Sequence, residues 1–126
     1  MEDNIDSNIG GPDRAYSRFE ALIMKLPDEG RAVESIQFAD KTINVFRATT
    51  LNSEYWFARI NENGSTGWRV MKGRPELLGK AVHLYGVNLA TGAAGIAAGG
   101  RLAVHCFNEK DSQPIYTSKI LRLEIL

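Results

Sequence analysis

The stretch "EYWFARINENGSTGWRVMK", residues 54–72, decides the fold class because apolar side chains recur on both sides of a polar turn. Two such runs joined by a short segment rich in Asn and Gly are typical of a β-hairpin. We expect Ala58 to pair with Trp68, which leaves "ENG" as a three-residue loop with Gly64 free to adopt positive φ. The sequence therefore predicts an antiparallel hairpin in the middle of the chain.

Neighbouring side chains of a strand point to opposite faces, so the odd and even residues of this hairpin form two sets. The even set is the more apolar, and we expect it to face the core. Its members are Trp56, Ala58, Ile60, Trp68 and Val70.

The odd-numbered face of the hairpin would then combine aromatic rings with cations. Rings that stack on bases and cations that hold phosphates are the combination that sheets use to bind single-stranded nucleic acid. An alternative places Tyr55 and Phe57 in the core and Trp56 at the surface, and the sequence leaves it open. With their cationic neighbours in the next segment, the candidate macromolecule-binding residues are Tyr55, Phe57, Arg59, Arg69, Lys72 and Arg74.

Alternation with a period of two continues along most of the chain. The segments between the alternating runs are rich in Gly, Asn and Pro, as in antiparallel meanders, sandwiches and barrels. We expect the regular C-terminal run to be paired inside the sheet. The expected strands are 34–39, 42–50, 54–61, 66–72, 80–88, 101–108 and 114–126.

One helix is predicted, over "DRAYSRFEALIMKL" at residues 13–26, where Asp13 caps the start and Pro27 ends the helix. Its apolar stripe is expected to pack on the sheet, while residues 1–12 form a polar tail. The predicted fold is α+β and mostly β: one domain over 13–126, with this helix on six or seven antiparallel strands in a partly closed barrel or sandwich. The stripe consists of Ala15, Phe19, Leu22, Ile23 and Leu26.

Composition excludes several classes of protein. The 126 residues carry 15 bases and 15 acids, but residues 1–40 hold nine acids against four bases, and residues 41–80 hold seven bases against three acids. No apolar run approaches the ~20 residues of a membrane span, and the acidic N-terminus does not read as a secretory signal. The single cysteine, Cys106, excludes an internal disulfide framework and favours a reducing compartment. We therefore expect a cytoplasmic protein without a membrane partner.

The runs 80–88 and 101–108 place two histidines opposite each other if Val82 pairs with Cys106. The facing pair, His83 and His105, could begin a metal site or a proton-transfer site. Two imidazoles are too few for a metal, however, and the sequence offers no third ligand. The apolar face of this pair consists of Val82, Leu84, Leu102, Val104 and Cys106. The other face carries His83, Tyr85, Val87, Arg101, Ala103, His105 and Phe107.

The stretch "ATGAAGIAAGG", residues 90–100, connects these two runs. It lacks the Gly-Lys-Ser/Thr of a phosphate loop and the glycine spacing of a dinucleotide loop. A short helical turn at residues 93–98 is expected, and the stretch is either a mobile hairpin tip or a surface that a protein neighbour orders. The candidate contact residues are Gly92, Gly95, Ile96, Gly99 and Gly100.

No linear motif indicates catalysis. The chain has no Gly-x-Ser-x-Gly, Cys-x-x-Cys or His-Glu-x-x-His, so the sequence names no catalytic, cofactor-binding or metal-binding residue. The first hypothesis is a small non-enzymatic binding or assembly protein that contacts a protein partner or a second copy of itself. The alternatives are a single-stranded nucleic-acid-binding β-domain, and a small-molecule-binding or enzymatic barrel that uses His83, Tyr85 and His105.

Overall fold

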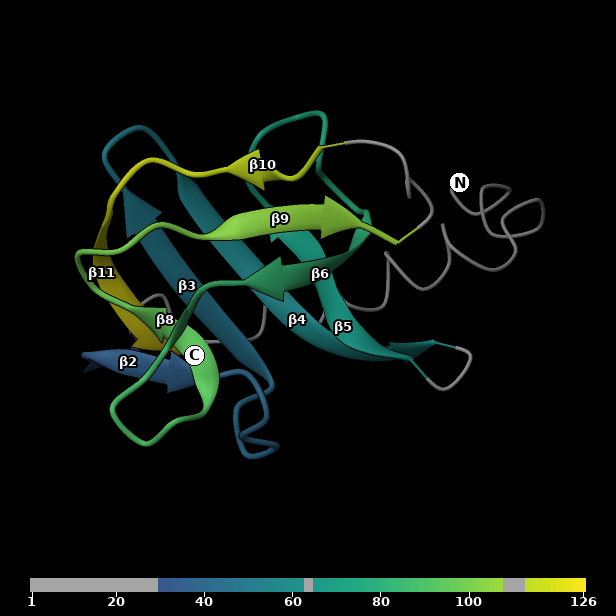
Figure 1. The fold of residues 1–126 in the computed structure, drawn as a ribbon. Helices are drawn as coiled ribbons and strands as arrows, with labels where there is room; N and C mark the ends of the chain where they lie inside the picture. Colours follow the sequence, from purple (N-terminus) through teal and green to yellow (C-terminus); the bar gives the residue numbers. More distant parts are fainter. Residues whose placement is uncertain (1–29, 63–64, 108–112) are drawn as a thin grey trace, which may run out of the picture.

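The computed structural model describes residues 30–62, 65–107 and 113–126, and this part of the chain is all-β (Figure 1). Antiparallel pairing joins every pair of neighbouring strands. The strands are β1 (Arg31–Val33), β2 (Ser35–Gln37), β3 (Val45–Thr50), β4 (Glu54–Glu62), β5 (Ser65–Lys72), β6 (Ala81–Tyr85), β7 (Val87–Asn88), β8 (Ala94–Ala97), β9 (Ala103–Cys106), β10 (Ile115–Tyr116) and β11 (Ile120–Ile125).

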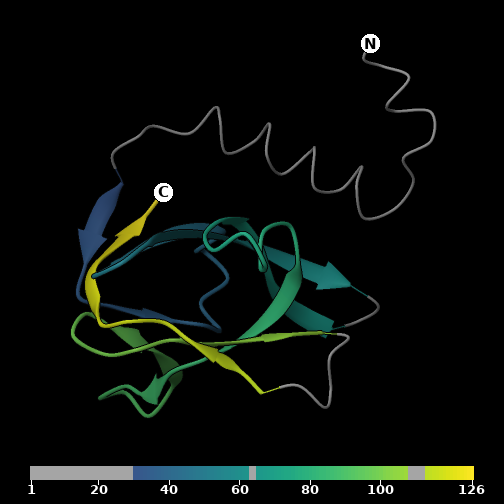
Figure 2. The same ribbon diagram turned by 90° about the horizontal axis from the view of Figure 1, so that it is seen from above.

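The strands form two sheets. The main sheet has eight strands in the order β1-β11-β3-β4-β5-β6-β9-β10, and the small sheet has three in the order β2-β8-β7. Figure 2 shows the main sheet strongly curved, with β3 and β4 on one side of the interior and β9 on the other. Its edge strands, β1 and β10, do not pair with each other, so the sheet does not close into a barrel.

The predicted fold class is therefore wrong. The described residues contain no helix, and their strands form an open eight-stranded sheet plus a three-stranded sheet, in place of a helix on six or seven strands. Strands of two to four residues, such as β7 and β10, are too short for alternation to mark them. The predicted helix at 13–26 and the polar tail at 1–12 lie outside the described residues.

The core lies on the concave side of the main sheet. Phe46 is at its centre, with ring centroids 5.2 Å from Phe57 and 5.0 Å from Trp68. Ile36 from β2 and Ile96 from β8 belong to the same buried cluster, so the small sheet packs on the interior of the main one. Apolar burial of this kind is the main stabilising contribution to the fold.

The register of the central hairpin differs from the prediction. Ala58 pairs with Arg69 and Phe57 pairs with Val70, and the pairing of Glu62 with Ser65 leaves two residues between the strands instead of three. A loop shorter by one residue pairs odd with even positions, which turns the side chains of one strand to the other face. The prediction that Ala58 faces Trp68 is wrong, and so is the expected outward position of the odd residues of β4.

The Gly/Ala stretch contains strand β8 where a helical turn was predicted, so that prediction is also wrong. A Cβ atom at Gly95 would lie 2.1 Å from the carbonyl oxygen of Ile36, so only glycine lets β2 approach β8 this closely. Gly92 and Gly99 have positive φ, at 88° and 95°. Gly95 and Ile96 are buried inside the domain, so they offer no contact surface, whereas Gly92 and Gly99 remain exposed.

Candidate functional site: the outer face of β6, β9 and β10

The predicted macromolecule-binding residues do not share one surface. Tyr55 and Phe57 are 2% and 0% exposed, and their rings stack in the core with centroids 5.9 Å apart. Burial raises the pKa of the Tyr55 hydroxyl. β4 was expected to present three side chains to a partner, and two of them, Tyr55 and Phe57, are instead packed in the core.

The third, Arg59, also has a structural role. Its guanidinium lies over the Trp68 ring and donates hydrogen bonds to three backbone carbonyls of residues 38–43, at 2.7–3.0 Å. Burial lowers the pKa of Arg59. This side chain ties the segment between β2 and β3 to the main sheet.

The remaining three residues also have partners within the chain. Arg69 is buried and donates from Nη1 to the carbonyl of Gly79 at 2.8 Å. The Lys72 ammonium lies 4.5 Å from the centre of the Trp56 ring. Arg74, in the turn after β5, forms a 2.6 Å ion pair with Glu76. The six residues are therefore spread over the core, the opposite face and a turn.

A different set of rings meets on the outer face of β6, β9 and β10. Val82 pairs with Cys106 and His83 with His105, which confirms the predicted register. Val82, Val104 and Cys106 are buried, so the opposite face, which carries both histidines, points away from the core. Alternation located this face correctly because only one side of these strands is apolar.

Two tyrosines form a row across this face. Ala103 pairs with Tyr85 of β6 and with Tyr116 of β10, so the three side chains lie side by side. Tyr85 is 53% exposed and Tyr116 is 64% exposed, whereas the small Ala103 between them is buried. Since neighbouring strands lie ~4.8 Å apart, the two tyrosines stand roughly 10 Å apart on three paired strands.

A stacked pair of rings borders the tyrosine row. The ring of His83 stacks on Phe107 with centroids 4.2 Å apart, and lies 6.5 Å from the Tyr85 ring. Gly67 of β5 makes room for Phe107, because a Cβ atom there would lie 2.5 Å from Cζ of that ring. We call the set His83, Tyr85, Ala103, His105, Phe107 and Tyr116 the tyrosine face.

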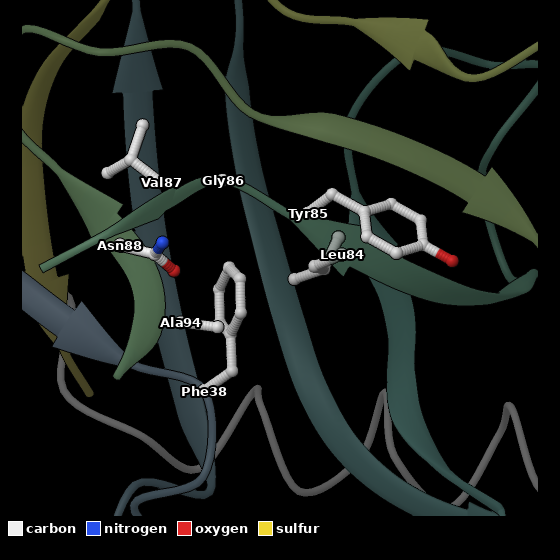
Figure 3. Close-up of a pocket in the computed structure, with 7 residues that line it drawn as sticks. All are labelled: Phe38, Leu84, Tyr85, Gly86, Val87, Asn88 and Ala94. Atoms are coloured by element: carbon white, nitrogen blue, oxygen red, sulfur yellow. The ribbon is translucent and has the colours of Figure 1, made fainter. Parts of the chain in front are cut away.

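A shallow groove adjoins Tyr85 where β6 leads into β7 (Figure 3). Phe38 and Asn88 lie on one side of it and Tyr85 on the other, and its volume is about 260 Å³. That is below the ~300–1,000 Å³ of an ordinary small-molecule site, so it suits one ring or side chain of a larger partner. Its lining consists of Phe38, Leu84, Tyr85, Gly86, Val87, Asn88 and Ala94.

The described stretch 77–107, which includes β6 and β9, carries charge of one sign. Residues 77–107 contain no Asp or Glu; their ionisable side chains include Lys80, Arg101 and the two histidines. Hydrogen bonds from Thr117 to Leu102 and from Ile120 to Gly100 hold the segment that carries Lys119 beside the one that carries Arg101. Both cations are exposed, and neither forms an ion pair within the described residues.

Tyr116 is not among the residues that the sequence singles out, because the pattern at 114–126 predicts a single strand. They form the separate strands β10 and β11, joined by residues 117–119. The "TS" at 117–118 is the only local signal of that break, since hydroxyl side chains compete for backbone hydrogen bonds. The Thr117 hydroxyl does so, accepting from Leu102 N at 3.1 Å and donating to Ser118 O at 2.9 Å.

Comparison with known proteins gives no match to a protein-family model, a curated protein or a solved structure. Within residues 30–62, 65–107 and 113–126, no three His, Cys, Asp or Glu side chains gather as a metal site. The part of the chain that the structure describes also has no helix that could cross a membrane. Function is therefore interpreted from the geometry of the tyrosine face.

Proposed function

We propose that this is a non-enzymatic binding protein that contacts a macromolecule through the tyrosine face. The observation that carries the proposal is the row of Tyr85 and Tyr116, both more than half exposed, at a spacing fixed by three paired strands. Tyrosine gives a large contact area and has few rotatable bonds to immobilise, so it contributes disproportionately to binding energy.

The shape of this surface favours a large partner over a small ligand. The rings stand on a sheet face rather than in a closed cavity, and the adjoining groove is open and small. A flat face buries a useful area only against another extended surface. Strand pairing fixes the rings before binding, which lowers the entropy lost on association.

The test is capture from a cell extract by tagged protein, with both bound protein and bound nucleic acid analysed, and light scattering to detect self-association. The double variant Tyr85→Ala/Tyr116→Ala is compared with Leu121→Ala, because Leu121 is 53% exposed, as Tyr85 is, and lies on β11. Wild type and Leu121→Ala should retain the same partner or self-associate, and the double variant should not. A monomer that retains nothing, or equal retention by the double variant, would overturn the proposal.

A further inference from the structure

We infer that the partner of the tyrosine face is single-stranded nucleic acid, an inference that rests on the binding function proposed above. Three features of the described residues carry it: the spacing of the exposed rings, the exposed cations Arg101 and Lys119, and the groove beside Tyr85 that contains the amide of Asn88. Each corresponds to one part of a nucleotide.

The rings suit the bases. Every base has a flat face, so exposed aromatic side chains bind single strands by stacking, with little dependence on sequence. Tyr85 and Tyr116 are separate platforms, since Ala103 between them is too small to fill the space above the sheet. A strand that crosses β6, β9 and β10 can place one base on each tyrosine.

The charges suit the phosphates. The chain from residue 77 to 107 has no carboxylate to repel a polyanion. Arg101 stands two residues before Ala103, and Lys119 lies on the adjoining segment, so both cations are close to the tyrosine row. Exposed cations without an ion pair among the described residues can replace the counterions of two phosphates.

The groove suits the edge of a base. The Asn88 side chain offers both a donor and an acceptor, and it faces the space between Phe38 and Tyr85. A base stacked on Tyr85 would bring its hydrogen-bonding edge towards this amide. A protein partner would bury less apolar area here, because the centre of the face consists of alanine and histidines rather than a large apolar cluster.

The experiment measures polarisation of fluorescein-labelled oligothymidylate and oligouridylate with the full chain. With two phosphate contacts, affinity should fall roughly sevenfold between about 50 and 200 mM salt. Tyr85→Ala and Tyr116→Ala should each weaken binding roughly 5- to 100-fold, whereas Tyr85→Phe and Tyr116→Phe keep the ring and should bind as wild type does. Arg101→Ala should halve the salt dependence, and Leu121→Ala should change nothing.

The outcomes separate this inference from the proposed function. No binding of either oligonucleotide at about 50 mM salt would overturn the inference. If the same protein then captures a protein, or itself, and loses it on Tyr85→Ala/Tyr116→Ala, the binding function stands with a protein partner. If oligonucleotides bind wild type and the double variant equally, the tyrosine face is excluded as the nucleic-acid site and the inference fails, while the capture experiment still decides the proposed function. Circular-dichroism melting of each variant confirms that it remains folded.

Discussion

The two halves of the main sheet present different outer faces. On β11, β3, β4 and β5 the paired residues Glu124, Arg47, Trp56 and Lys72 form a continuous row. On β6, β9 and β10 the corresponding row is Tyr85, Ala103 and Tyr116. Both rows contain aromatic side chains on a paired sheet, and they differ in whether the chain itself supplies partners.

The side chains of the first row make ion pairs, hydrogen bonds and cation–π contacts with one another and with their neighbours. Arg47 Nε donates to Glu124 at 2.7 Å, Arg122 forms an ion pair with Glu124 at 3.2 Å, and the indole N–H of Trp56 donates to Glu54. The Trp56 ring lies against Arg47 on one side and Lys72 on the other, 5.6 and 4.5 Å from the ring centre. Aromatic and basic residues here stabilise the sheet and leave little for a partner.

The second row has exposed rings, and the cations beside it, Arg101 and Lys119, form no ion pair among the described residues. The comparison teaches that aromatic-plus-basic composition alone does not identify a binding surface. A candidate binding surface is distinguished by rings and charged groups that remain exposed to solvent after folding. Four substitutions test whether the two faces differ in this way.

The largest effect is expected from Trp56→Ala in the first row. Trp56 is buried with Val45, Ala58 and Met71, and truncation leaves a cavity and two cations without their ring. We expect a loss of about 3–5 kcal/mol in the free energy of unfolding, measured by urea denaturation. A loss below about 1 kcal/mol would show that Trp56 contributes no more to stability than an exposed residue, and the contrast with the tyrosine face would fail.

The second prediction concerns pH and Glu124. The hydrogen bond from Arg47 holds the pKa of the Glu124 carboxylate below its usual range. The carboxylate therefore stabilises the fold above the unfolded-state pKa of about 4.3, and this contribution is lost as pH falls through the lower folded-state pKa.

Glu124→Gln should cost about 1.5–3 kcal/mol at pH 7, the value of a hydrogen bond to a charged group. The gap between wild type and variant should narrow when denaturation is repeated below about pH 4. A gap that stays constant with pH would show that Glu124 acts through packing rather than through its charge.

The third prediction moves to the border of the tyrosine face. Gly67→Ala would push the Phe107 ring, since the new Cβ would lie 2.5 Å from its Cζ. The end of the ring can shift, but the new Cβ would also lie 2.8 Å from the backbone carbonyl oxygen of Val82 on the neighbouring strand, so we expect a loss of about 1–2 kcal/mol. The stack of His83 on Phe107 should also be disturbed, which the NMR shifts of the His83 ring protons would report; unchanged shifts would contradict the predicted contact.

The smallest effect on stability is expected from Tyr85→Ala. An exposed residue away from the core contributes within about 0.5 kcal/mol, so thermal unfolding should barely change. A loss above about 2 kcal/mol would show that Tyr85 is part of the fold and would break the contrast with Trp56.

The same contrast explains what the sequence could predict. On β6 and β9 only one parity is apolar, so alternation gave the register and the pairing of His83 with His105. On β4 the consecutive residues Tyr55, Trp56 and Phe57 are all buried because both faces are covered, so parity could not say which face is the core. The two-residue Asn63-Gly64 signal between alternating runs would have given the correct register.

Other parts of the fold and site left weaker traces in the sequence. The tyrosine row depends on a pairing between β9 and β10, and β10 has only two residues. The small sheet depends on close backbone contacts at Gly86 and Gly95, which the alternation of apolar and polar residues in the sequence does not indicate. Tertiary contacts of this kind determine which exposed rings end up side by side.

The open edges of the main sheet have a consequence for aggregation and for the mode of recognition. Within the described residues, the edge strands β1 and β10 span only three and two residues, so each offers very little free backbone to another strand. Short edges are one way in which natural sheets avoid templating fibrils. They also leave little backbone for β-strand addition, so the binding proposed above would depend on side chains rather than on extension of the main sheet.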